Sequence, residues 1–149
     1  MKYRRLFEPI NLGNVRIKNR IYLPPAQLYL SEDPSGRFTH RFIAYFRERA
    51  KGGVGLIMTC HVRAERTIDP YPAIVRFPCI EDPIEKKFFA ELAEAVHEYG
   101  AKIACQLSAG TGRLADTLLD GYYPAAPSEI PLFNFPDLKT RALTTQSKL

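Results

Sequence analysis

The sequence is poor in the residues that build disulfide frameworks and metal centres. Its 149 residues include three cysteines and three histidines. Cys60, Cys79 and Cys105 form no C-x-x-C pair, and no histidine stands at zinc-finger spacing from them. The pattern excludes a disulfide scaffold and predicts no metal site. It indicates buried or free thiols in a reducing compartment.

Long apolar runs are absent as well. No stretch approaches the roughly 18 apolar residues that a membrane-spanning helix requires. The basic start MKYRRLFEPINLG is interrupted by Glu8 and Pro9, so it lacks the apolar region of a signal peptide. We therefore expect a soluble, cytoplasmic protein with no membrane partner.

Clustered positive charge is also missing. The 21 Lys and Arg residues exceed the 16 Asp and Glu residues, which gives a formal net charge of +5. The basic residues are interspersed with acids, as in FRERAKGG, whereas a nucleic-acid groove needs them gathered beside exposed aromatics. We expect solvated helix faces and no nucleic-acid partner.

What the sequence does contain begins with a hairpin pattern. In LFEPINLGNVRIKNRIYLPP, apolar residues fall near alternate positions on either side of Gly13 and Asn14, which favour a tight turn. The second arm is predicted to run as far as Pro24 and Pro25. Proline has no N–H to donate, so the strand ends there.

Two helices and two further strands follow. Residues 37–51 place apolar side chains at helical spacing, and residues 54–59 form a short apolar run typical of a strand buried on both faces. A second helix is predicted from Asp82, an N-cap followed by Pro83 and by Glu85 three residues on, to Gly100. The apolar residues expected on the helix faces are Phe42, Ile43, Phe46 and Ala50 in the first helix, and Ile84, Phe88, Leu92, Ala95, Val96 and Tyr99 in the second.

The order of these elements predicts an α/β fold. After residues 101–107, another buried strand, the chain reads strand, helix, strand, helix, strand, which is typical of a parallel sheet with crossover helices. Beyond Arg113 the regularity fades, because repeated prolines prevent a long helix. The sheet is left with an open edge, so we expect the chain to be the front part of a larger fold.

The glycines after the third strand allow a dinucleotide site. The motif G-x-G-x-x-G/A is satisfied by Gly110, Gly112 and Ala115. A dinucleotide site also needs a long helix after the glycines and an acidic residue at the end of a second strand. The acidic residue at the expected distance, Glu129, lies among prolines instead.

Gln106 offers another kind of site. At the carboxyl end of a barrel strand its carboxamide can donate and accept at once, which suits the pyrimidine edge of a flavin.

Four segments of the chain, in order, resemble the amino-terminal part of the old yellow enzyme family. They are LFEPINLGNVRIKNRIYLPP, GGVGLIMT, DPIEKKFFAELAEAVHEYGAKIACQL and GTGR. These are FMN-dependent NADH:flavin oxidoreductases that include enoate and 2,4-dienoyl-CoA reductases. The resemblance implies a TIM (β/α)8 barrel with the hairpin capping its bottom and FMN at its top. Residues 1–149 would then be a partial FMN-binding barrel of about three parallel strands with their crossover helices, truncated before the fourth strand.

The resemblance also implies residues for the first part of the site. Pro24, Pro25, Ala26 and Gln27 match the end of the first strand, whose backbone packs against the flavin. Members usually have Thr or Cys at the position of Gln27, so we expect either that the redox properties of the flavin differ or that this contact is lost. Tyr29 matches a tyrosine that some members place over the substrate.

The second and third strands would supply the rest of the flavin contacts. In TCHV, His61 stands where a small residue usually meets the flavin. It is carried here as a flavin contact, and the alternative is that the larger ring obstructs the flavin. The family pattern Q-L-x-H-x-G-R reads QLSAGTGR here, so Gln106 keeps its flavin-edge role while Ala109 replaces a histidine. Because Ala109 replaces that histidine, the family pattern does not identify the substrate.

By resemblance, the activity is transfer of hydride from NAD(P)H via FMN to an activated alkene or similar small-molecule acceptor. The family's substrate-binding pair and phosphate loops lie later than residue 149, so we expect little activity from this chain alone and assign no catalytic residue. The alternatives are a non-catalytic half-barrel interaction protein, which could form a homo-oligomer through the open sheet edge, and an NAD-binding module.

Overall fold

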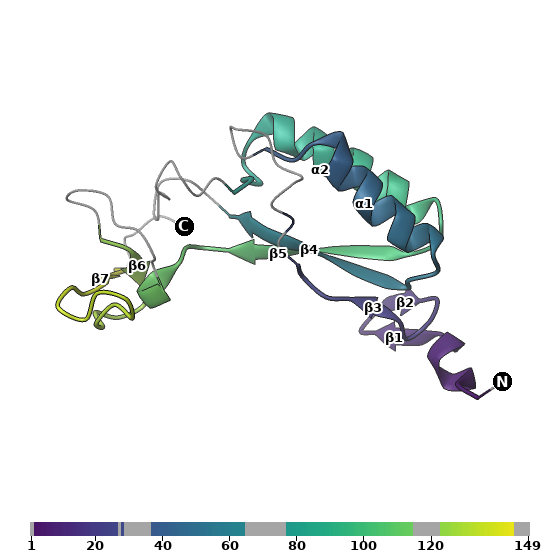
Figure 1. Ribbon diagram of the computed structural model, residues 1–149, viewed down its shortest axis with the longest axis horizontal. Helices are drawn as coiled ribbons and strands as arrows, with labels where there is room; N and C mark the ends of the chain where they lie inside the picture. Colours follow the sequence, from purple (N-terminus) through teal and green to yellow (C-terminus); the bar gives the residue numbers. More distant parts are fainter. Residues whose placement is uncertain (1, 27, 29–36, 65–76, 115–122, 145–149) are drawn as a thin grey trace.

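A three-stranded parallel sheet with two helices on one side forms the centre of the structure (Figure 1). The computed structural model describes residues 2–26, 28, 37–64, 77–114 and 123–144. The sheet has the order β3-β4-β5, and a helix precedes each of its last two strands. These elements are β3 (Tyr22–Leu23), α1 (His40–Lys51), β4 (Leu56–Arg63), α2 (Pro83–His97) and β5 (Lys102–Ser108). The predicted alternation of parallel strands and crossover helices is confirmed.

The amino-terminal hairpin is also present, but it is shorter than predicted. Strands β1 (Ile10–Leu12) and β2 (Val15–Ile17) pair antiparallel around Gly13, whose φ is 55°. The second arm ends at Ile17, and β3 is a separate strand. Asn19 accounts for the break, because its side chain donates to the Gly53 carbonyl at 2.7 Å and accepts from the Ile21 N–H at 3.1 Å. These bonds turn the chain out of the hairpin and into the sheet.

The core lies between the sheet and the two helices. Buried side chains from both layers meet there, and each of the large ones, such as Phe42 and Leu92, contributes roughly 1.5–3 kcal/mol by leaving water. The fully or nearly fully buried members of this cluster are Phe38, Phe42, Phe46, Ala50, Ile57, Cys60, Val62, Leu92, Val96 and Ala101. The sheet is therefore covered on one face. We call the other face, which carries Met58, Ala104 and Gln106, the open face.

The start of α2 corrects the predicted apolar stripe. Asp82 caps the helix as predicted, since its carboxylate accepts from the Ile84 N–H at 2.9 Å. Ile84, however, is 45% exposed, whereas Glu85 is fully buried. Glu85 precedes Leu92 by seven residues, about two helical turns, so it shares the inward face and Ile84 points aside.

Two further differences concern the ends of elements. Strand β4 continues to Arg63 instead of ending at Thr59. Near the carboxyl end, β6 (Ala125–Ala126) and β7 (Arg141–Ala142) form a short parallel pair that the sequence pattern did not predict. Strands of two residues are too short to show periodicity. Short 3-10 helices occur at Arg4–Phe7 and Gly112–Leu114.

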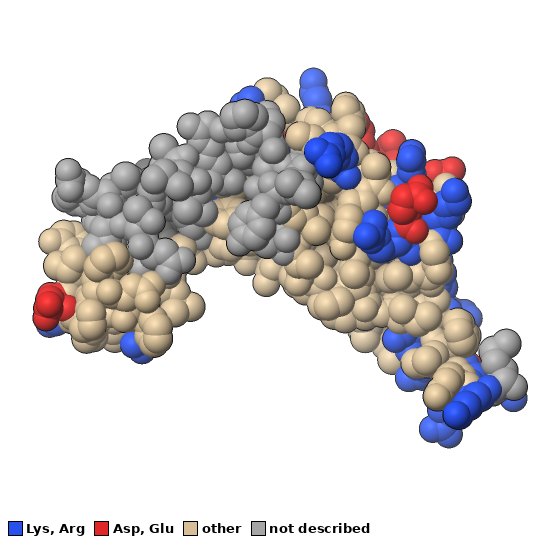
Figure 2. Space-filling model, viewed as in Figure 1, with Lys and Arg blue, Asp and Glu red and all other residues tan. Residues whose placement is uncertain are grey.

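Charged side chains and the open face occupy different parts of the surface. In Figure 2, Lys, Arg, Asp and Glu gather over the helices and toward the amino terminus, while the surface beneath the sheet shows few of them. In the described part of the chain, no helix has the length and apolar character needed to cross a membrane.

We predict that Gly55→Ala lowers the free energy of unfolding by about 1–3 kcal/mol, as for other overpacked sites. An added Cβ would lie 2.9 Å from the Asn19 carbonyl oxygen and would also collide with the Asn19 side chain. Chemical denaturation measures the change. Gly52→Ala is the control, because its Cβ would make ordinary contacts of 3.4 Å and should shift stability by less than about 0.5 kcal/mol. Equal effects of the two substitutions would contradict the clash.

Candidate functional site

The sheet brings His61 and Gln106 directly together. In the parallel ladder between β4 and β5, His61 pairs with Gln106. Their neighbours in the chain, Cys60 and Cys105, pack on the helix side, so His61 and Gln106 share the open face. Both lie near the carboxyl ends of their strands, which is the edge where α/β barrels hold their ligands.

Residues after β3 reach the same edge, because the three strands run in one direction. Pro24 and Ala26 are exposed there and Pro25 is half-buried. The predicted contacts from Gln27 and Tyr29 lie outside the described residues. The described part of the predicted site thus comes from three successive strand ends.

His61 is held by an aromatic neighbour. Its ring stacks on Phe77, with centroids 4.4 Å apart and planes inclined by 17°. Burial lowers the pKa of His61 below its usual 6.5, and the positive charge of Arg63 lowers the pKa further. The imidazole is therefore neutral at neutral pH and can donate from one nitrogen and accept at the other. Phe77 gave no sequence signal, because this contact joins a strand to a distant loop.

We predict that the C–H resonances of His61 titrate with a midpoint below 6.5 in NMR spectra. Arg63→Gln should move the midpoint upward but leave it below 6.5, because burial is the larger cause of the shift. Arg63→Lys keeps the charge and serves as the control. Since the unfolded chain binds more protons below pH 6.5, this histidine should make unfolding easier as the pH falls from 6.5 through the folded pKa. A titration midpoint above 6.5 would contradict the lowered pKa of His61.

The chemistry of Gln106 suits a flavin edge. Its side chain is exposed on the open face, so the carboxamide can both donate and accept. The neutral imidazole of His61 beside it adds another group of the same kind. No charged group belongs to this pair, and a pyrimidine-like edge with alternating acceptors and a donor matches it. The donor set is therefore compatible with FMN.

The glycine turn after β5 has a structure unlike a dinucleotide loop within the described residues. Gly110 and Gly112 have φ values of 146° and 53°, and the Ser108 hydroxyl accepts from the Gly110 N–H at 3.2 Å. A three-residue 3-10 helix begins at Gly112. A helix of this length presents no aligned N-terminus to a pyrophosphate, so this part of the turn does not favour the NAD-binding alternative.

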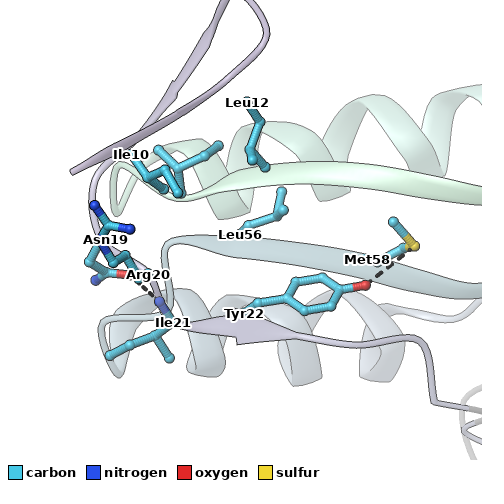
Figure 3. A pocket seen from close by; sticks show the side chains of 9 residues that line it. Ile10, Leu12, Asn19, Arg20, Ile21, Tyr22, Leu56 and Met58 are labelled. Carbon is cyan, nitrogen blue, oxygen red and sulfur yellow. Dashed lines mark hydrogen bonds between the residues drawn. The ribbon is translucent and has the colours of Figure 1, made fainter. Parts of the chain in front are cut away.

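A cavity of about 360 Å³ lies at the opposite end of the sheet (Figure 3). Tyr22 crosses its floor, with its hydroxyl 3.5 Å from the Met58 sulfur. The cavity is mainly apolar and sits between the hairpin and the amino ends of the strands, away from Gln106. Barrel ligands bind at the other end, so we do not place the cofactor here. The lining residues are Ile10, Leu12, Ile17, Asn19, Arg20, Ile21, Tyr22, Leu56 and Met58.

The cysteines are free thiols, as predicted. Cys60 and Cys79 are buried, and Cys105 is half-buried. Burial raises the pKa of Cys105, and a hydrogen bond with Thr59 offsets part of that rise. The thiol stays protonated and unreactive at neutral pH. Among the residues that the structure describes, no group of three or more His, Cys, Asp or Glu side chains could hold a metal.

Comparison with known sequences gives consistent matches. The model of the NADH:flavin oxidoreductase / NADH oxidase family matches residues 5–134. The cinnamate reductase of Clostridium sporogenes is 40% identical over 149 residues, which cover 97% of this chain and 22% of that protein. The NADPH dehydrogenase of Bacillus subtilis is 36% identical over 126 residues, which cover 83% of this chain and 35% of that protein.

Solved structures share the fold. An old yellow enzyme from a Pichia species superimposes with a TM-score of 0.75 at 25% identity, over 96% of this chain and 38% of that chain. Morphinone reductase in complex with tetrahydroNAD gives a TM-score of 0.71 at 27% identity, over 94% of this chain and 41% of that chain. The chain thus spans between 22% and 41% of the length of these four proteins.

Proposed function

Because the chain belongs to the NADH:flavin oxidoreductase / NADH oxidase family, we propose that it forms one part of an FMN site in an NAD(P)H-dependent reductase. The observation that carries this proposal is the pairing of His61 with Gln106 at the carboxyl edge of the sheet. FMN would supply the hydride chemistry, taking hydride from NAD(P)H and passing it to an acceptor. The protein supplies orientation and hydrogen bonds.

The proposed roles follow the three strand ends. The Gln106 carboxamide holds the pyrimidine edge of the flavin, and the neutral His61 imidazole lies beside it. The backbone of Pro24–Ala26 packs against the ring system, where two successive prolines stiffen the chain. Gln27 is proposed as a further flavin contact and Tyr29 as a substrate contact, both on the strength of family resemblance.

The acceptor is proposed to be an activated alkene or a similar small molecule. One relative is named for cinnamate, whose double bond is conjugated to a carboxylate. Others are named as a bilirubin reductase and a metal reductase, so the family resemblance supports a class of electron acceptors and not one compound. None of the described residues is assigned as the proton donor.

We predict that Gln106→Ala weakens FMN binding by this chain about tenfold or more, since it removes hydrogen bonds worth about 1 kcal/mol each. Quenching of flavin fluorescence during titration measures the dissociation constant. Lys102→Ala is the control, because Lys102 is exposed at the amino end of the same strand and should leave the affinity unchanged. Unchanged affinity in the Gln106 variant would refute the proposed contact.

The sheet edges support a further proposal about assembly. In the described part of the chain, β3 and β5 each pair on one side only. Leu107 on β5 is 53% exposed, and open strands with apolar side chains pair readily with other chains. We propose that two copies of the chain associate through the β5 edge of the sheet.

We predict that Leu107→Lys converts the associated form to monomer, because a charge on an edge strand blocks pairing. Sedimentation velocity at several concentrations measures the state. Leu114→Lys is the matched control, since Leu114 is 63% exposed but lies outside the sheet. A wild-type chain that stays monomeric at every concentration would refute association through this edge.

A further inference from the structure

The ladder between β4 and β5 contains one irregularity, and it lies beside the proposed site. Met58 pairs with Ala104, and the next regular pair is His61 with Gln106. Two residues of β4, Thr59 and Cys60, therefore stand opposite Cys105 alone. This is the geometry of a β-bulge, in which one strand has an extra residue.

The bulge decides which face His61 occupies. If the pairing of Met58 with Ala104 continued regularly, Cys60 would stand opposite Gln106 and His61 opposite Leu107. Side chains alternate along a strand, so a shift of one residue moves each of them to the other face. The bulge places Cys60 in the core on the helix side, where it is 1% exposed, and turns His61 to the open face.

Thr59 occupies the bulge with its side chain buried. It is 1% exposed, and its hydroxyl donates to the Cys60 carbonyl at 3.0 Å. The same oxygen accepts from the backbone N–H of Gln106 at 3.2 Å. In a regular parallel ladder, a backbone carbonyl would accept from such an N–H. The threonine hydroxyl thus takes the place of a ladder acceptor at the residue whose side chain we assign to the flavin.

We propose that Thr59 is a positioning residue, whose hydroxyl fixes the backbone of Gln106 at the bulge and so holds the Gln106 and His61 side chains next to each other for the flavin. It contacts neither cofactor nor substrate. The flavin part of this inference rests on the proposed function. A group that binds the edge of a rigid ring must be held within a fraction of an ångström, and loss of its support costs affinity.

The chain offers matched variants. Thr59→Val keeps the shape but removes the hydroxyl, while Thr59→Ser keeps the hydroxyl. Thr140→Val is the control, because the Thr140 hydroxyl is also buried and accepts from a backbone N–H, that of Ile130 at 3.1 Å, near strands β6 and β7. The control loses an equivalent bond far along the chain from the proposed site.

Amide hydrogen exchange, followed by NMR on the whole chain, tests the hydrogen bond. The Gln106 amide should be protected in the wild type and should exchange about tenfold faster in Thr59→Val, relative to its neighbours, as expected for a lost hydrogen bond. Thr59→Ser should restore protection, and Thr140→Val should affect Ile130 but not Gln106. An unprotected Gln106 amide in the wild type, or equal protection in the wild type and Thr59→Val, would overturn the proposal. If Thr59→Val does not fold, the wild-type measurement still tests the hydrogen bond, because an unprotected Gln106 amide would overturn the proposal.

FMN titration of the same proteins tests the consequence for the site. The dissociation constant should rise about tenfold in Thr59→Val and stay near the wild-type value in Thr59→Ser and Thr140→Val. Faster exchange at Gln106 with unchanged FMN affinity would make Thr59 merely structural and overturn its positioning role. Failure of all four proteins to bind FMN would refute the proposed function of this chain, and the exchange rates would then decide separately whether Thr59 fixes Gln106.

Discussion

The register between β4 and β5 sets the geometry of the described site. Parallel pairing places the ends of successive strands at one edge, and the bulge at Thr59 and Cys60 sets which side chains face away from the helices. Cys60 and Val62 then fill the core while His61 joins Gln106. One extra residue in a strand thus serves packing on one face and ligand chemistry on the other.

The covered face supplies the rigidity that such a site needs. Phe42 and Phe46 of α1 meet in the core at a ring distance of 4.7 Å, and Leu92 and Val96 of α2 are also buried there. These contacts fix β4 and β5 from the helix side of the sheet. The open face can therefore carry polar side chains while the strands stay in place. Figure 1 shows both helices on this side of the sheet. The separation of packing from chemistry is typical of α/β barrels, in which strand ends carry the ligand groups.

Much of the fold followed from local signals. The helix at Asp82 was predicted because its cap, its proline and its terminal glycine all act within a few residues, and the cap is present as expected. The hairpin was predicted from Gly13 and Asn14 for the same reason. The errors arose where a distant residue intervenes. Asn19 ends the hairpin arm by bonding to Gly53, 34 residues away, and no local pattern contains that contact.

The candidate site shows the same contrast between local signals and contacts made by residues distant in the sequence. The strand–helix alternation, the family and the presence of Gln106 at a strand end could all be predicted from the amino-acid sequence, because periodicity, caps and motifs are local or linear properties. Three-dimensional packing was needed to place His61 inside β4, opposite Gln106 and stacked on Phe77, and to bring the Thr59 hydroxyl to the Gln106 backbone. Those relations depend on the register between two strands that lie far apart in the sequence. A register is set by how whole layers pack, which no single segment encodes.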